Sequence, residues 1–179
     1  MSRWVTYLLA VAILCSAGCA CSGYRVELAP ETDMNRQQGA VRVDLVWMTP
    51  ADAHRLQNTT SLAWFKGVDG NDPLAQSREF QHRTITARVG LKDAGGPLMV
   101  LGDGDLVPPE NLDVVGFVVF ARYSKMPELA QDGLHDYYDA KAKKTRTTNL
   151  KTCHFIVRLE SNQLTLEPQP RTGIQGLLP

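Results

Sequence analysis

The chain has 179 residues, and its 19 Lys and Arg residues balance its 19 Asp and Glu residues, so the formal net charge is zero. Without a basic excess, nucleic acid is not expected as a partner, because nucleic-acid-binding domains carry basic patches that neutralise phosphates. The length suits a single domain behind a short N-terminal segment.

Residues 1–18 have the order of a secretory signal. Arg3 supplies a positive charge, an apolar run extends from Trp4 to Cys15, and small residues lead to Cys19. The apolar run is about a dozen residues, which is short for a helix that must cross a ~30 Å hydrocarbon core. The sequence therefore favours a cleaved signal over a permanent membrane helix.

The cleavage region Ser16-Ala17-Gly18-Cys19 resembles the lipobox of bacterial lipoproteins. This resemblance implies cleavage before Cys19 and attachment to membrane lipid through acyl chains on that cysteine. Two or more chains give a stable anchor. Ala20 follows, rather than the Asp that retains lipoproteins in the inner membrane of enteric bacteria, so we expect an outer-membrane protein facing the periplasm. An ordinary signal peptide followed by an incidental cysteine is the alternative.

Three cysteines would remain after cleavage, namely Cys19, Cys21 and Cys153. With Cys19 acylated, a disulfide between Cys21 and Cys153 is possible in an oxidising compartment. The alternative is two unpaired thiols, one of them in a flexible tether. Residues 19–39 are mixed and polar, and they are expected to form this tether, with room for a short strand at 24–28.

The first core strand is expected at 40–48, where apolar and polar residues alternate and indicate burial of one face. Arg42 and Asp44 fall on the other face. Thr49 and Pro50 then form a helix start, as an N-cap and a first helical residue. A helical insertion is expected through Phe65, followed by a loop at 67–73.

Residues 78–91 alternate in their second half and predict a strand there, and further strands are expected at 98–101, 147–160 and 163–167, the last two forming a hairpin around Ser161-Asn162. Residues 114–123 are apolar on both faces in the middle of the segment, which indicates a central strand covered on both sides. Residues 126–142 are ambiguous between loop and helix. We therefore predict a signal peptide (1–18), a tether (19–39) and a β-sandwich domain (40–179).

No catalytic set, metal site or cofactor motif is evident, so the protein is not expected to be an enzyme. The four histidines, His54, His82, His135 and His154, lack zinc-like spacings. The run from His135 to Asp139 could contribute metal ligands, but it is only a fragment. Gly102-Asp103-Gly104-Asp105 lacks the further carboxylates of a calcium loop and is better explained as a turn.

Two surface features have alternative interpretations. The basic residues Lys141, Lys143, Lys144 and Arg146 could contact anionic lipid headgroups or an acidic partner, but protection of a strand edge explains them better. Trp64 and Phe65 could fill the core under the helix or be exposed to a partner. Burial in the core is favoured.

The order of motifs resembles the TssJ family, the outer-membrane lipoproteins of type VI secretion systems. The resemblance rests on the lipobox, the strand Val41–Leu45, the insertion ending near Trp64-Phe65, and the segments 72–74, 115–123 and 155–167. It implies an all-β, transthyretin-like β-sandwich with a short helical insertion after the first core strand. It also implies binding to the periplasmic domain of the inner-membrane protein TssM, without enzymatic activity.

In that family a loop between early strands contacts the partner, which corresponds by order to residues 49–74 here. The resemblance therefore suggests a partner-binding set: Leu56, Leu62, Trp64, Phe65, Asp72 and Leu74. No nucleic acid and no small-molecule substrate is expected.

A second hypothesis is a periplasm-facing lipoprotein module that binds a small ligand or glycan. It is motivated by aromatic residues in segments expected as loops: Trp64, Phe65, Tyr137 and Tyr138. It requires that these side chains line a concave cleft.

Overall fold

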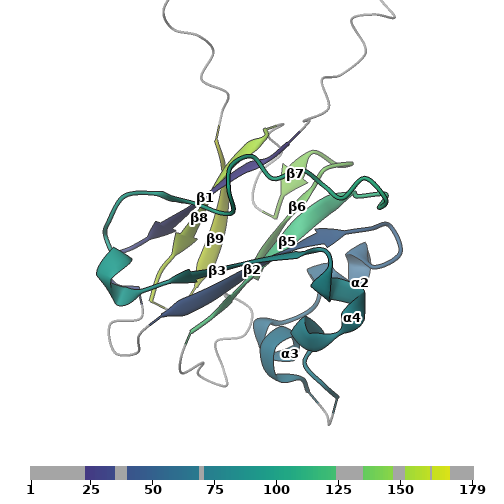
Figure 1. Cartoon of the computed structure of the whole chain (residues 1–179), viewed down its shortest axis with the longest axis horizontal. Coiled ribbons are helices and arrows are strands. Elements are labelled where there is room, and N and C mark those ends of the chain that lie inside the picture. Colours follow the sequence, from purple (N-terminus) through teal and green to yellow (C-terminus); the bar gives the residue numbers. More distant parts are fainter. Residues whose placement is uncertain are drawn as a thin grey trace, which may run out of the picture.

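The computed structural model describes residues 23–34, 40–68, 71–123, 135–146, 152–161 and 163–169 (Figure 1). The expected signal peptide, the lipobox and residues 147–151 lie outside these ranges. The described strands form two sheets with the orders β4-β1-β8-β9 and β3-β2-β5-β6-β7. This arrangement confirms the predicted all-β sandwich.

The four-stranded sheet joins the first and last strands of the chain. Its members are β4 (Met99–Val100), β1 (Arg25–Pro30), β8 (His154–Leu159) and β9 (Leu164–Gln169). β1 pairs with β8 in parallel, from Arg25 opposite His154 to Pro30 opposite Leu159. The hairpin of β8 and β9 confirms the predicted closing pair.

The five-stranded sheet contains the apolar centre of the chain. Its members are β3 (Thr84–Val89), β2 (Val41–Met48), β5 (Gly116–Arg122), β6 (His135–Asp139) and β7 (Lys144–Thr145). All its pairings are antiparallel. Its inner face packs on the other sheet, and Tyr24, Trp47, Phe117, Tyr138 and Phe155 are among the large buried side chains between them.

Four short helical segments lie between β2 and β3; the first two confirm the insertion expected through Phe65, and the last two extend it beyond that residue. They are α2 (Ala53–Gln57), α3 (Ser61–Lys66), the 3₁₀ turn η1 (Leu74–Gln76) and α4 (Arg78–Gln81). A second 3₁₀ turn, η2 (Leu91–Asp93), follows β3. Figure 1 shows α2, α3 and α4 gathered over one end of the five-stranded sheet, on its outer face.

The insertion forms a second, smaller core with that outer face. Val46 and Met48 of β2 and Val118 and Phe120 of β5 are fully buried against the insertion, where Trp64 is central. β5 is thus buried on both faces, as its sequence predicts. β2 was expected to be buried on one face only, and this expectation is wrong because the helices cover the other face.

Residues 24–34 correct the predicted extent of the tether. They form β1 and the turn after it, and Val26, Leu28 and Met34 are buried in the core. Apolar and polar residues alternate here over too few positions to distinguish a strand from a polar spacer in the sequence. Cys153, just before β8, is disulfide-bonded, and the other three cysteines of the chain all lie outside the described residues.

Two further details differ from the sequence predictions. Residues 135–139, left open between loop and helix, form β6, which pairs with β5 from His135 opposite Phe120 to Asp139 opposite Gly116. The helix α2 starts at Ala53, later than expected, and is preceded by a turn in which Asp52 accepts hydrogen bonds from the Thr49 N–H and hydroxyl. No helix in the described ranges is long and apolar enough to cross a membrane.

Candidate functional site

The outer face of the five-stranded sheet carries a buried carboxylate that joins three elements. The Asp44 side chain is fully buried and receives four hydrogen bonds. Its Oδ1 accepts from Arg42 Nε and from Thr86 Oγ1, each at 2.8 Å. Its Oδ2 accepts from Arg42 Nη2 at 2.9 Å and from Trp64 Nε1 at 3.0 Å. Asp44 therefore ties α3 to β2 and β3.

Trp64 completes this connection by packing. Its ring stacks on Phe120 of β5, with centroids 4.7 Å apart and planes 7° apart, and it meets Phe80 of α4 edge-on. The next residue, Phe65, lies under the guanidinium of Arg42, 5.5 Å from its ring centroid. The insertion is thus fixed to the sheet by aromatic packing and by one buried carboxylate.

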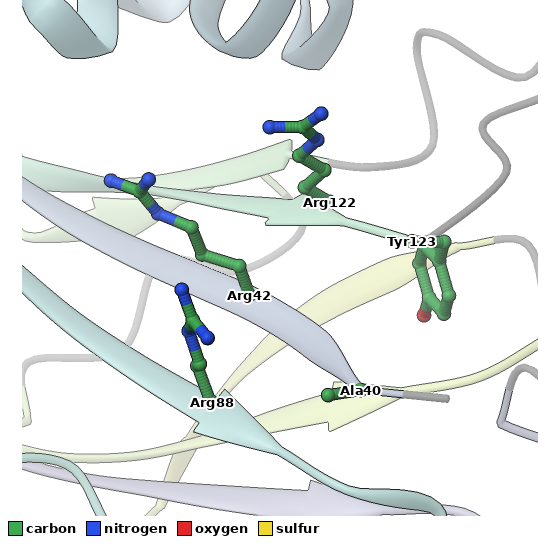
Figure 2. A pocket seen from close by; sticks show the side chains of 5 residues that line it. All are labelled: Ala40, Arg42, Arg88, Arg122 and Tyr123. Atoms are coloured by element: carbon green, nitrogen blue, oxygen red, sulfur yellow. The ribbon is translucent and has the colours of Figure 1, made fainter. Parts of the chain in front are cut away.

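Beyond the insertion, the outer face ends in a row of arginines. Arg42 of β2 pairs in register with Arg88 of β3 on one side and with Arg122 of β5 on the other. The three side chains, with Ala40 and Tyr123, line a pocket of about 250 Å³ (Figure 2). We call Arg42, Arg88 and Arg122 the arginine row.

The charges of the arginine row are only partly compensated within the described chain. Arg42 is paired with Asp44. The side chains of Arg88 and Arg122 are exposed, and neither makes an ion pair with any residue in the described ranges. The row therefore combines one fixed cation with two cations that can bind an anion.

A second pocket, of about 430 Å³, lies between α2 and α4. Its charged groups are already paired: Arg83 Nη1 is 2.6 Å from Asp52 Oδ2, with both side chains buried, and Arg55 Nη2 is 2.8 Å from Glu79 Oε1. A pocket whose charges satisfy one another offers little to a charged ligand. These ion pairs hold the helices of the insertion together.

The two ends of the sandwich differ in what they present. Tyr24, where the described chain enters β1, packs against Trp47 and Phe117, with ring centroids 5.7 Å apart in each case. Trp47 is near the end of β2, whereas Arg42 is near its start. The arginine row thus lies at the opposite end from the chain entry, roughly 17 Å along the strand at ~3.3 Å per residue.

The predicted basic cluster lies at the entry end. Lys141 and Lys143 are exposed in the turn between β6 and β7, and this turn follows Tyr138, whose ring is 5.9 Å from that of Tyr24. β7 is the edge strand of its sheet. Basic residues beside an edge strand agree with the interpretation that they protect the edge.

The His135–Asp139 run does not assemble a metal site. Its residues alternate along β6, so successive side chains point to opposite faces. Burial raises the pKa of Asp136, although the backbone N–H groups of Leu166 and Tyr137 hydrogen-bond to its carboxylate and oppose this shift. No group of three potential ligands within the described ranges could hold a metal ion, Asp103 and Asp105 included.

The partner-binding set inferred from the resemblance divides by burial. Leu56 and Trp64 are fully buried and Phe65 is 5% exposed, so these three side chains cannot meet a partner in this conformation. Their apolar character serves the second core, in agreement with the core interpretation of Trp64 and Phe65. Leu62 and Leu74 are partly exposed and Asp72 is exposed, so these three remain available on the surface.

The aromatic cleft required by the ligand or glycan hypothesis is not formed. Tyr138 is 2% exposed and lies in the main core, where burial raises the pKa of its hydroxyl to about 12. Trp64 and Phe65 are buried in the second core, and only Tyr137 is partly exposed. Trp64, Phe65 and Tyr137 pack together in the second core and Tyr138 lies in the main core, so the four do not line one exposed cleft.

The arginine row was not recognised from the sequence. Each arginine follows the alternation of its own strand, and the strand patterns do place Arg42 and Arg88 on polar faces. What unites the three is the register of two strand pairs between distant segments. The only signal in the sequence is an arginine at one end of each of three expected strands.

No family model and no curated protein matches this sequence significantly. Two solved structures resemble it in three dimensions. A chain described as "Type VI membrane complex" is 12% identical at a TM-score of 0.48, covering 82% of this chain and 98% of that chain. A chain described as "T6SS protein TssM C-terminal domain" from EAEC is 15% identical at a TM-score of 0.43, covering 80% and 98%. At these values neither similarity defines what this chain does.

Proposed function

We propose that this protein is a lipoprotein anchored through Cys19 in the outer membrane and facing the periplasm. There it tethers a type VI secretion membrane complex by binding the periplasmic domain of a TssM-like inner-membrane subunit. The observation that carries the proposal is the N-terminal sequence, in which a short apolar run leads through Ser16-Ala17-Gly18 to Cys19. The role is structural and includes no catalysed reaction.

The fold supports the proposal through the order of its elements. A β-sandwich whose helical insertion lies between β2 and β3 is the arrangement that the TssJ resemblance implies. The insertion is held rigidly by Asp44 and Trp64, as a scaffold for protein contacts needs. The two structural similarities name the same secretion system, but their low scores do not carry the proposal.

Anchoring is tested by substituting Cys19→Ser in the full chain and fractionating cells. We expect the variant in the soluble periplasmic fraction, because the acylated side chain is absent, while Cys15→Ser, which leaves the lipobox intact, stays with the outer membrane. Metabolic labelling with an alkyne fatty acid should mark the wild type and not Cys19→Ser. Retention of Cys19→Ser in the membrane would refute the anchor.

Tethering is tested by crosslinking in cells, solubilising membranes and identifying what co-purifies with the tagged full chain. We expect the TssM-like subunit to be recovered with the wild type. Recovery of the tagged chain without any inner-membrane secretion subunit would refute the tethering role. That outcome would leave the lipid anchor intact, so the two parts of the proposal are judged separately.

A further inference from the structure

We propose that the arginine row is a docking site for an acidic segment of a protein partner, with Arg88 and Arg122 binding two of its carboxylates. The row is Arg88 of β3, Arg42 of β2 and Arg122 of β5, and Figure 2 shows the three side chains around one pocket. The row borders the insertion, because Arg42 contacts Phe65, but its ligand chemistry differs from that of the apolar insertion surface that the TssJ resemblance implies.

The arrangement has a cost for the isolated domain. Residues directly opposite in neighbouring strands have Cβ atoms about 5 Å apart, and like charges there repel. Asp44 neutralises only Arg42. Protection of a sheet edge could explain Arg88, because β3 is an edge strand, but β2 and β5 are interior strands. The two charges that stay uncompensated within the described ranges, on Arg88 and Arg122, are better explained by an anion that binds between them.

The geometry favours carboxylates on an extended chain. The outer two arginines belong to strands two positions apart, so their backbones are about 9.6 Å apart at ~4.8 Å per strand. Alternate residues of an extended segment are about 7 Å apart, a distance that two long arginine side chains can bridge. Each guanidinium can hold a carboxylate through two parallel N–H groups.

Arg42 has a different role in this site. Its guanidinium is fixed by two hydrogen bonds to Asp44 and by contact with the Phe65 ring. Asp44 balances its charge, so Arg42 adds little net attraction, and its fixed position shapes the space between the two outer arginines without an ordering cost. Arg88 and Arg122 attract the segment and make the contacts.

The pocket's size and position indicate the source of the anion. Its volume of about 250 Å³ is below the ~300–1,000 Å³ usual for sites that enclose a small molecule, so a surface contact is favoured. The row also lies at the opposite end from Tyr24. This last step rests on the proposed function: a chain anchored just before residue 23 presents the row to the periplasm and away from lipid headgroups.

The test uses the full mature chain in detergent and a short fluorescent peptide in which glutamate alternates with serine. A matched peptide with glutamine in place of glutamate measures the uncharged background. We expect the glutamate peptide to bind and the double variant Arg88→Gln/Arg122→Gln to weaken binding about tenfold per arginine, since tenfold corresponds to 1.4 kcal/mol. The variant Lys141→Gln/Lys143→Gln, which removes equal charge at the other end, should bind as the wild type does.

Folding does not confound this comparison, because Arg88 and Arg122 make no ion pairs within the described ranges. The double variant should melt at the wild-type temperature or slightly above. Equal binding of the two peptides, or equal loss in the lysine variant, would overturn the proposal. A further outcome would also overturn it: the peptide does not bind, but the Cys19→Ser chain binds phosphatidylglycerol vesicles in a way that requires Arg88 and Arg122. That result would assign the row to lipid. Failure of the anchor would instead appear only in the cell fractionation.

Discussion

Substituting Asp44→Asn should destabilise the domain through a mismatch of donors. Four donors point at the two carboxylate oxygens, and an asparagine offers one oxygen and one NH₂ group. The best orientation turns the NH₂ group toward Oδ1's partners, where the Thr86 hydroxyl can rotate to accept but Arg42 Nε cannot. One charge-assisted hydrogen bond is lost and the remaining ones weaken.

The expected magnitude follows from these contacts. A hydrogen bond to a charged group is worth about 1.5–3 kcal/mol, and Arg42 is 36% exposed and can recover part of this from water. We therefore expect a loss of about 2–3 kcal/mol in the free energy of unfolding. At about 2–4 °C per kcal/mol for a domain of this size class, the melting temperature should fall by roughly 5–10 °C.

The assay is thermal and urea unfolding, followed by circular dichroism and by Trp fluorescence. Trp64→Phe is the comparison variant: it removes the indole N–H that donates to Asp44 and also shrinks a fully buried ring, so it should cost about 1 kcal/mol for the hydrogen bond and a further loss for the cavity. The loss of unfolding free energy in the double variant should be smaller than the sum of the two single losses, since both substitutions act on the same carboxylate. An Asp44→Asn variant that melts within about 1 °C of the wild type would refute the central role of Asp44.

Two further predictions concern pH and redox state. Burial raises the pKa of Glu27, but hydrogen bonds from Arg25 and His154 outweigh this and hold it below its usual 4.5. As the pH falls below that value, the unfolded chain binds more protons than the folded chain, so the free energy of unfolding of the wild type should decline. In Glu27→Gln, the free energy of unfolding measured with urea should depend less on pH across this range. Cys153 is disulfide-bonded, and acylation of Cys19 would leave Cys21 as its partner. Peptide mapping without reduction should therefore find Cys21 linked to Cys153. The variant Cys21→Ser should lower the free energy of unfolding by about 4–5 kcal/mol in the chain-entropy model. A Cys19–Cys153 link would contradict both the pairing and the anchor.

Elements with strong local patterns could be predicted from the sequence. Residues 114–121 are apolar on both faces, which requires cover on both sides, and β5 is buried along this length up to the exposed Arg122. The segment His135–Asp139 could not be assigned, because its His, Asp and Tyr residues have no clear alternation of polarity. Its burial comes from the strands and helices around it rather than from its own composition.

The candidate site shows the limit of such reasoning more sharply. That Trp64 lies in the core followed from its hydrophobicity, but its bond to Asp44 depends on how α3 crosses β2. The arginine row depends on two registers at once. A shift of one residue in either pairing would turn one arginine to the opposite face, and local sequence does not specify such long-range registers.

The parallel pairing of β1 with β8 bears on how the domain would respond to mechanical load. β1 runs from the entry end toward the end that carries the arginine row, and all 6 of its residues pair with β8. A pull applied before Gly23 and resisted at the arginine row would act along the strand, roughly across its hydrogen bonds. Those bonds would then be loaded in shear and share the force, rather than opening one after another from an end. Under such a load the sandwich would resist tension along the continuous six-residue pairing of β1 with β8.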